Sequence, residues 1–220
     1  MIFITGCSKS ESNDGPIYGE NVTDIDGNVY HTVIIQGQTW MVENLRTTHY
    51  NDDAKTAIPI VTDSTAWKGL TTSAYCFYNN DAANNATYGA LYNWYAASNS
   101  KLCPKGWHIP SNKEWLDLIT QLGGESTAGN LLKEKGTTRW NSPNSGASNN
   151  SGYTALPGGS RYGNGKFYDI HICGYWWSTS EFNIYNAWGG WLAYDKSNVG
   201  SFYVSKTLGF SVRCVKDIVK

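Results

Sequence analysis

The sequence predicts a single α+β domain, in which two main helices and a twisted antiparallel sheet are joined by long loops. Helical patterns occur in the middle of the chain, whereas short β-branched and aromatic runs alternate with turns in its carboxyl half. Gly, Asn, Ser and Thr are abundant, which favours turns over long helices. No internal repeat or linker interrupts residues 24–217, so this range is predicted to be one domain, followed by a tail at residues 218–220.

The charge balance excludes two classes of partner. The chain has 17 Lys and Arg against 18 Asp and Glu, a formal net charge of -1. Long-range attraction to nucleic acid or to an anionic membrane surface is therefore not expected. No apolar run is long enough to span a bilayer, so membrane contact is expected only through a lipid anchor.

The amino terminus carries the candidate anchor. Ile4-Thr5-Gly6-Cys7 resembles the lipobox of bacterial lipoproteins, in which small residues precede an acylated cysteine. We expect lipidation at Cys7, a start that has been truncated, and a lipid-anchored location in the cell envelope, at the outer membrane. Residues 1–23 are then the lipobox remnant and a flexible tether. The alternative is a free Cys7 in a disordered tail.

The first half of the domain is predicted to contain a hairpin and a helix. Residues 30–35 and 39–42 are β-rich runs around Gly37, which is typical of a hairpin. A long loop follows, then a short strand at residues 74–78. Apolar residues at i, i+3, i+4 and i+7 predict a first helix over residues 88–98.

The second helix has the clearest local signals. Ser111 and Glu114 have the spacing of a capping box, an apolar stripe follows them, and Gly123-Gly124 ends the helix. A shorter helix is predicted over residues 128–135, with Thr127 as its cap. The Ser/Asn/Gly-rich loop at residues 137–152 is either ordered by its own hydrogen bonds or mobile.

The carboxyl half is predicted to be antiparallel β-structure. Its β-runs are separated by turns and lie at residues 154–156, 159–162, 166–168, 175–180, 188–194, 199–204 and 209–215.

Six segments of the chain resemble the Fibrobacter succinogenes major paralogous domain. They are CPKGWHIPSNKEW (103–115), WMVENL (40–45), YGALYNW (88–94), LPGG (156–159), GYWWS (174–178) and GFSVRCV (209–215). The element HIPSxxEW is also similar to one in sulfatase-modifying enzymes. The resemblance implies a C-type-lectin-like fold, which agrees with the two helices and the carboxyl-terminal sheet inferred from the residues.

The resemblance also implies a disulfide and a variable region. A Cys103–Cys214 disulfide would tie the helical region to the last strand and contribute about 4–5 kcal/mol by the chain-entropy model. Cys76 and Cys173 form either a second bridge or two thiols. The family includes proteins diversified by retroelements, whose variable stretch corresponds here to residues 179–208.

Catalytic patterns are absent from the sequence. The four histidines are isolated, and neither HExxH nor GxSxG occurs. We expect His108 to hold the loop onto the helix that follows. Sulfatase-modifying enzymes bind copper through a nearby cysteine pair, whereas Cys173 and Cys214 are 41 positions apart. Glu181, Asn183, Asp195 and Asn198 carry oxygen atoms of the kind that binds calcium, but the triplets with which C-type lectins bind it are missing, so calcium-dependent sugar binding is the disfavoured alternative. We therefore expect no enzyme activity, cofactor or metal; a sulfatase-modifying-type oxidase is the least favoured alternative.

Residues 176–203 contain nine large aromatic rings interleaved with Asn, Asp and Glu, a mixture that favours recognition. Strand alternation buries about half of the rings and leaves at least two or three exposed. The function predicted is a surface lipoprotein binding a glycan or a protein on another surface; the alternative is a structural component of a surface assembly. The candidate ligand-binding residues are Trp177, Glu181, Asn183, Tyr185, Asn186, Trp188, Trp191, Tyr194, Asp195 and Asn198.

Overall fold

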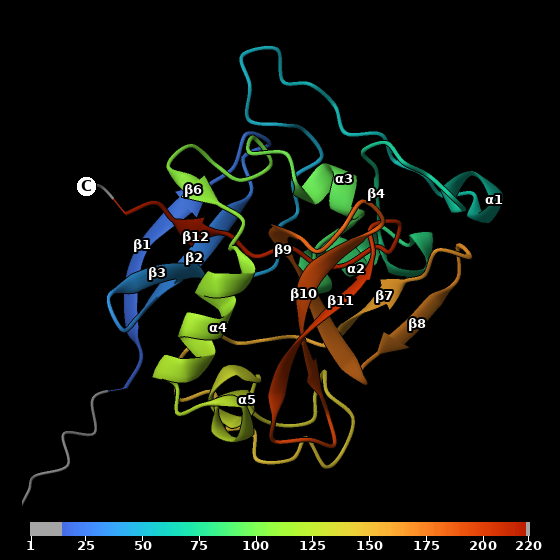
Figure 1. The fold of residues 1–220 in the computed structure, drawn as a ribbon. Helices are drawn as coiled ribbons and strands as arrows, with labels where there is room; N and C mark the ends of the chain where they lie inside the picture. Colours follow the sequence, from blue (N-terminus) through green and yellow to red (C-terminus); the bar gives the residue numbers. More distant parts are fainter. Residues whose placement is uncertain (1–14, 219–220) are drawn as a thin grey trace, which may run out of the picture.

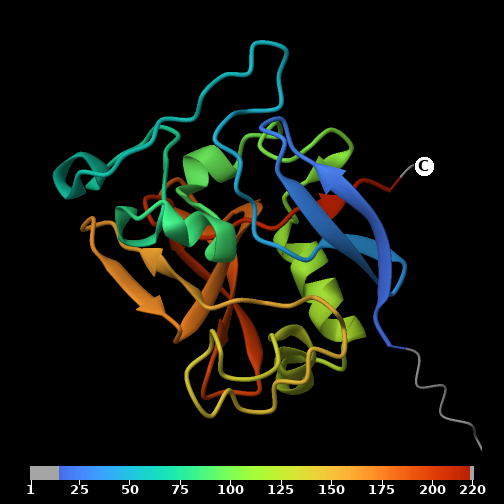
Figure 2. The same ribbon diagram turned by 180° about the vertical axis from the view of Figure 1, so that it is seen from behind.

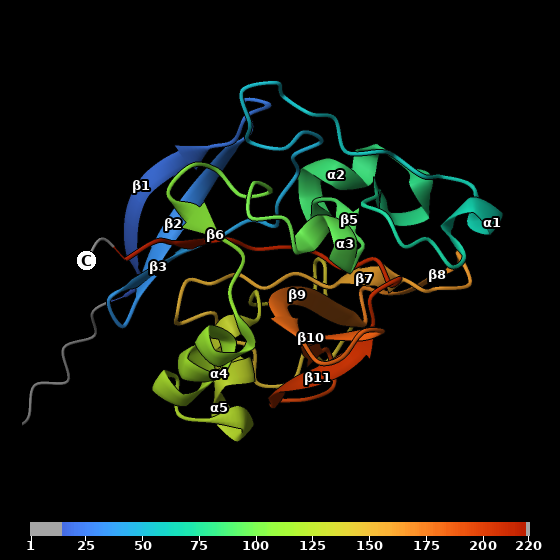
Figure 3. The same ribbon diagram turned by 45° about the horizontal axis from the view of Figure 1, so that its top comes forward.

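The computed structural model describes residues 15–218 and confirms a single domain of mixed α+β structure, with its strands in two main sheets (Figure 1). Cys7, and with it the predicted lipid anchor, lies outside the described residues. One sheet combines strands from the two ends of the domain with a short strand from its middle, and the other is built from its carboxyl half. The helices α4 and α5 lie against the carboxyl sheet, on the side toward the amino-terminal strands (Figures 1 and 3).

The amino-terminal sheet has the order β1-β2-β3-β12-β6. Its strands are β1 (Ile17–Thr23), β2 (Val29–Ile35), β3 (Gln38–Met41), β12 (Val215–Lys216) and β6 (Trp107–His108). The predicted hairpin is confirmed as β2–β3, and both turn residues, Gln36 and Gly37, have positive φ. β1 lies within the predicted tether, so that part of the prediction is wrong. Its residues are mostly exposed, and backbone pairing to β2, which local composition does not reveal, holds them in the sheet.

The carboxyl sheet has the order β11-β10-β9-β7-β8. Its strands are β7 (Gly158–Arg161), β8 (Phe167–Ile170), β9 (Cys173–Glu181), β10 (Asn186–Ala193) and β11 (Val199–Ser205). The antiparallel prediction is correct for every pair except β7 and β9, which run parallel. The predicted runs at residues 154–156 and 209–215 form isolated bridges, except where β12 begins.

The two longest helices are α4 (Asn112–Gln121) and α5 (Glu125–Leu132). The capping box of α4 is confirmed, because Ser111 Oγ accepts from Glu114 N–H and the Glu114 carboxylate accepts from Ser111 N–H. α5 begins earlier than predicted, after Gly124, whose φ of 86 reverses the chain there; Thr127 lies inside the helix and is not its cap. In the described chain no helix has the length and apolarity needed to cross a membrane.

The predicted helix over residues 88–98 does not form. Three short helical segments, α1 (Ser64–Trp67), η1 (Tyr78–Asn80) and α2 (Ala83–Tyr88), precede the point where Gly89 (φ 75) ends α2. The chain then forms β5 (Leu91–Tyr92), paired with β4 (Tyr75–Cys76), before Asn93 caps α3 (Trp94–Ala97). A Cβ at position 89 would lie 2.8 Å from Leu45 O. Tertiary contact therefore overrides the helical periodicity.

A disulfide and an ordered loop complete the framework. The Cys103–Cys214 disulfide is confirmed, whereas Cys76 and Cys173 are free thiols. The loop at residues 137–152 follows the ordered alternative. For example, Asn144 Nδ2 donates to Glu134 O and Gly136 O. Figure 2 shows this loop, in yellow, at the bottom of the molecule before the chain runs across to β7.

Candidate ligand-binding surface

Four of the six segments that carry the family resemblance meet at a buried hub around Asn44. Asn44 Oδ1 accepts hydrogen bonds from Trp176 Nε1 and from Arg213 Nη2, each at 2.9 Å. Its Nδ2 donates to Tyr88 O and Ser211 Oγ. Asn44 and Arg213 are 2% and 1% exposed. These motif residues therefore hold distant segments together and are not available to a ligand.

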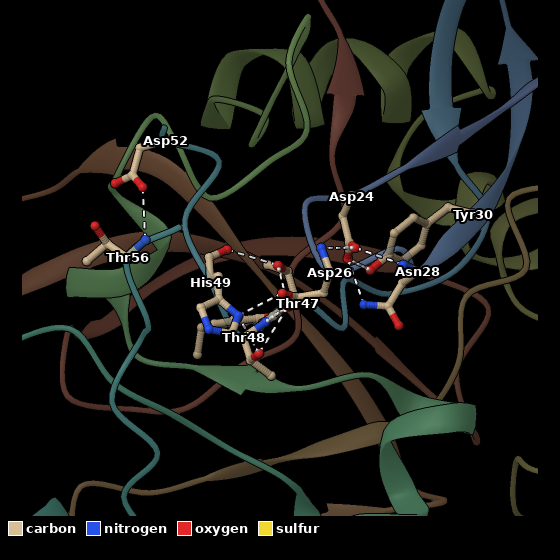
Figure 4. A network of polar contacts seen from close by, with 10 residues as sticks. Asp24, Asp26, Asn28, Tyr30, Thr47, Thr48, His49, Asp52 and Thr56 are labelled. Carbon is tan, nitrogen blue, oxygen red and sulfur yellow. Dashed lines mark hydrogen bonds and ion pairs between the residues drawn. The ribbon is translucent and has the colours of Figure 1, made fainter. Parts of the chain in front are cut away.

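A second polar network, which sequence analysis missed, fixes the β1–β2 turn (Figure 4). The Asp24 carboxylate accepts from Tyr30 Oη and from backbone N–H groups of the turn. Asp26 accepts from Thr48 and contacts His49 Nδ1 at 2.7 Å. Burial opposes ionisation, but these hydrogen bonds lower the pKa of Asp26 below its ordinary value. The carboxylates are already engaged, and within residues 15–218 no cluster of three His, Cys, Asp or Glu residues is placed to hold a metal.

One predicted ligand contact, Trp177, is wrong. It is 1% exposed, its indole donates to Tyr92 O at 2.8 Å, and its ring packs on Phe210 at 4.6 Å. β9 directs this side chain into the core between the sheet and β5, so no ligand reaches it.

The two tryptophans of β10 lie on opposite faces of the sheet. They are an odd number of residues apart in a strand whose pairing with β11 is regular, so their side chains point in opposite directions. Trp188 pairs with Tyr203 and packs near Phe182. Trp191 lies opposite Gly200 on β11 and Tyr175 on β9. A single ligand face therefore does not contain both.

Three other predicted residues lie at the far end of β10. Tyr194, Asp195 and Asn198 belong to the β10–β11 connection. Tyr185, in the β9–β10 turn, and Asn186, the first residue of β10, lie at the other end. Tyr194 packs partly buried against the core beneath α4 and α5. The ten predicted residues are thus distributed over the core, both faces of the sheet and both ends of the hairpin.

Within the aromatic-rich stretch, an exposed apolar surface lies at the β9–β10 turn and the adjoining end of β11. Four of its side chains are exposed: Phe182 (44%), Ile184 (71%), Tyr185 (71%) and Tyr203 (53%). Trp188 is half-buried beneath them. We call these five residues the aromatic patch. Phe182 and Tyr203 stack with ring centroids 3.9 Å apart and planes at 10°. The prediction of at least two or three exposed rings is confirmed.

Predicted contact residues shape the turn that presents the patch. Asn183 Oδ1 accepts from the backbone N–H groups of Tyr185 and Asn186, each at 2.9 Å. Asn186 O accepts from the N–H groups of Phe182 and Asn183. The Asn183 side chain and the Asn186 backbone thus close the turn and set the direction in which the patch residues point.

A buried lysine anchors the same turn from below. Lys206 is 4% exposed, and its Nζ donates to Glu181 Oε1 at 2.7 Å and to Ile184 O at 3.1 Å. The ammonium also lies 4.5 Å from the ring centroid of Trp94. The backbone N–H of Lys206 donates to Tyr185 O. The patch is therefore preorganised, which lowers the entropy cost of binding.

Two hollows of the described surface lie away from the patch. One of about 360 Å³ is lined by the ends of β1 and β2 with Leu122, and one of about 270 Å³ by Glu43, Thr87, Glu134 and Arg139 among others. Neither is lined by a residue of the aromatic patch.

His108 connects α4 to the end of β12, in line with the structural role expected for it. Its Nε2 lies 2.9 Å from Glu114 Oε1 and its Nδ1 2.5 Å from Asp217 Oδ1. The hydrogen bond to Glu114 raises the pKa of His108, against the opposing effect of burial, and Asp217 raises it further. The hydrogen bond from His108 lowers the pKa of Glu114 to about 2.

We expect this trio to make stability depend on pH. A raised histidine pKa stabilises the fold fully below the ordinary value of 6.5, and that contribution is lost as pH rises through the folded-state pKa. The lowered pKa of Glu114 means that its carboxylate stabilises the fold fully above pH 4.5. This stabilisation is lost as the pH falls toward about 2. Because the site is half-exposed and solvent screens its charges, the loss of stability at alkaline pH is less than about 1 kcal/mol. Urea unfolding of wild type and His108→Gln between about pH 6 and 8 tests this; equal pH slopes would contradict it.

Sequence reasoning missed Ile184 and left Phe182 and Tyr203 out of the ligand-binding set. Both rings lie in the aromatic-rich stretch, but their stacking depends on the cross-strand pairing of Trp188 with Tyr203 and on the path of the turn. Nothing in the local sequence distinguishes an exposed Ile184 from a buried one. The only signal available was the excess of rings over what one sheet face buries.

Comparison with protein families gives one match. The model of the Fibrobacter succinogenes major domain matches residues 33–216, the range that contains the Asn44 hub and the aromatic patch. No curated protein and no solved structure matches the chain. Because the family model covers most of the chain, this protein belongs to the Fibrobacter succinogenes major domain family.

Proposed function

We propose that this chain is a non-catalytic recognition domain that binds a protein on another surface through the aromatic patch. The observation that carries the proposal is the exposure of three stacked or neighbouring rings and Ile184 on a turn that buried Lys206 holds in place. Exposed apolar clusters of this kind are typical of interaction sites, in which aromatic residues contribute most of the binding energy.

The chemistry of the patch favours a protein over a glycan. Sugar sites combine rings with free polar side chains, but Asn183 and Glu181 are engaged in holding the turn. Ile184, with its aliphatic side chain 71% exposed, suits an apolar pocket on a protein partner. A glycan stacked on Tyr185 or Tyr203 is the second candidate, and the experiment below distinguishes the two.

The remaining parts of the proposal are a C-type-lectin-like fold and an envelope anchor. The Cys103–Cys214 disulfide joins the segment before α4 to the strand at the end of the domain, as the family resemblance implies for that fold. The lipobox-like sequence at Cys7 supports an outer-membrane lipoprotein. The patch also lies between residues 178 and 209, the stretch proposed to be diversified, where exposed turn residues tolerate substitution without loss of the core.

The test compares a patch variant with a matched control. Phe182→Ser/Ile184→Ser/Tyr185→Ser removes three patch side chains, and Tyr162→Ser/Tyr168→Ser removes an exposed ring pair of 42% and 38% exposure on the β7–β8 hairpin. Binding of each protein to Gram-negative outer-membrane vesicles is measured by surface plasmon resonance. We expect the patch variant to bind at least about tenfold more weakly and the control to bind as wild type does.

Treatment of the vesicles assigns the partner. Protease is expected to remove the binding sites and periodate to leave them. The opposite pattern would make the ligand a glycan. Absence of wild-type binding, or equal binding by the patch variant, would reject recognition by the patch.

A further inference from the structure

β11 is an open edge of the carboxyl sheet. It is the terminal strand of the order β11-β10-β9-β7-β8, and it pairs with β10 in a regular register over all seven residues. α5 and α4 pack on β11 and on the connection before it: Ser197 O would lie 2.3 Å from a Cβ at Gly129, and Ser201 Oγ donates to Asn112 Oδ1. Figure 3 shows the rest of β11 at the outside of the molecule with no other element beyond it.

At alternate residues, the backbone N–H and C=O groups of β11 point away from β10. The N–H of Lys206 donates to Tyr185 O, so the hydrogen-bonded pairs with β10 continue at positions 204, 202 and 200. Tyr203 and its neighbours Ser201 and Ser205 therefore direct their N–H and C=O groups away from β10. Ser205 O accepts from Leu208 N–H. The open segment is thus five residues long and centred on Tyr203.

The other long or exposed edges of the two sheets carry features that discourage pairing. β1 contains Glu20 and an irregular register between Gly19 and Val22. β8 has four residues, one of which, Asp169, has a φ of 68. β6 has only two residues. β11 has no charge, proline or bulge between residues 199 and 205, although such protection is usual for an edge strand.

We propose that β11 pairs antiparallel with β11 of a second copy of this chain, about a two-fold axis at Tyr203. This register places Tyr203 opposite the partner's Tyr203, Phe202 opposite the partner's Val204, and Ser201 opposite the partner's Ser205. Compatible side chains then face each other on both sides of the new strand pair. One side has aromatic–β-branched pairs, and the other has the two tyrosines flanked by serines. All of these residues are neutral, so no like charges oppose the pairing. The two sheets become one sheet of ten strands.

The dimer would bring two aromatic patches together, because Tyr203 belongs both to the open edge and to the patch. Only this consequence, bivalent binding to a surface, rests on the function proposed above; the pairing of β11 does not. Two linked sites raise the effective affinity for a partner presented many times on a surface.

Sedimentation velocity of the whole chain at about 1–200 μM tests the dimer. Wild type is expected to change with concentration from one chain of 24.3 kDa to two. Tyr203→Lys and Tyr203→Glu, which put like charges opposite each other, are each expected to remain monomeric. An equimolar mixture of the two is expected to dimerise again because unlike charges then meet; Tyr203→Phe, the matched control, should dimerise as wild type does.

Several results would overturn the proposal. The first is a wild type that stays monomeric at every concentration in this range, and the second is dimer formation by both charged variants. The third is an equimolar mixture that stays monomeric although circular dichroism shows that both variants are folded. If the variants do not fold, amide exchange of wild type decides: protection at Ser201, Tyr203 and Ser205 must rise with concentration. Tyr185→Lys separates the two proposals, since it should lose vesicle binding but keep the dimer.

Discussion

Replacing Cys103 and Cys214 together with serine is expected to lower the free energy of unfolding by about 4–5 kcal/mol, because the bridge closes a loop across a sequence separation of 111 residues. Both cysteines are buried in the core, but the strand that follows Cys214 has few backbone pairings. β12 has two residues, and its pairing with β3 rests on Val215 opposite Trp40. The bridge therefore restricts the unfolded chain and also holds the strand that joins the two halves of the amino-terminal sheet.

Urea unfolding followed by tryptophan fluorescence measures this loss. Cys173→Ser is the matched control, because Cys173 is a half-buried free thiol in the same molecule. The control is expected to change stability by less than about 1 kcal/mol. A loss of under about 1 kcal/mol in the double variant would show that the unfolded chain is already restricted without the bridge.

Replacing Lys133 with methionine is expected to cost about 3 kcal/mol, because it leaves three carbonyls without their donor in a site the side chain still fills. Lys133 is 0% exposed, and its Nζ donates to Ser145 O at 2.9 Å, Ala193 O at 3.1 Å and Lys196 O at 2.7 Å. Burial lowers the pKa of this lysine to about 8, opposed by Asp195, so the ammonium is still charged at pH 7. One cation thus ties two loops to the end of α5.

The control for this change is Lys113→Met on the exposed face of α4, where the side chain is 82% exposed and pairs with Asp117. It is expected to shift stability by no more than about 0.5 kcal/mol. Amide exchange should show that Lys133→Met reduces exchange protection mainly at residues 144–145 and 193–196. Exchange at the aromatic patch, at the other end of β10, should be unchanged; a uniform loss across the molecule would contradict the local role.

Elements whose signals are local were predicted well. The Ser111–Glu114 capping box, the Gly123-Gly124 stop and the turn at Gly37 each depend on residues a few positions apart. The helix over residues 88–98 failed although its periodicity was good. Tyr88, Leu91 and Tyr92 are all buried, but Tyr88 lies at the end of α2 and the other two lie in β5. Gly89, with its close approach to Leu45 O, separates the two elements.

The candidate site was predicted as a region and not as a set of residues. Sequence located the aromatic excess between residues 176 and 203, and the structure separates it into buried Trp177, outward Trp188 and Trp191 on the opposite face. Assigning a ring to a face needs the pairing register. Register is set by partner strands far away in the chain, because a shift by one residue moves every side chain to the other face.

Composition, turn residues and family motifs were thus enough to establish an α+β domain, its main helix, its disulfide and the absence of known catalytic patterns. Tertiary structure alone decided that β1 joins the sheet, that Asn44 and Arg213 are a buried hub, and that Phe182, Ile184, Tyr185 and Tyr203 meet on one surface. The physical reason is range. Caps and turns depend on hydrogen bonds between residues that are close in the sequence. Whether a side chain is exposed depends on how every other segment of the chain packs around it.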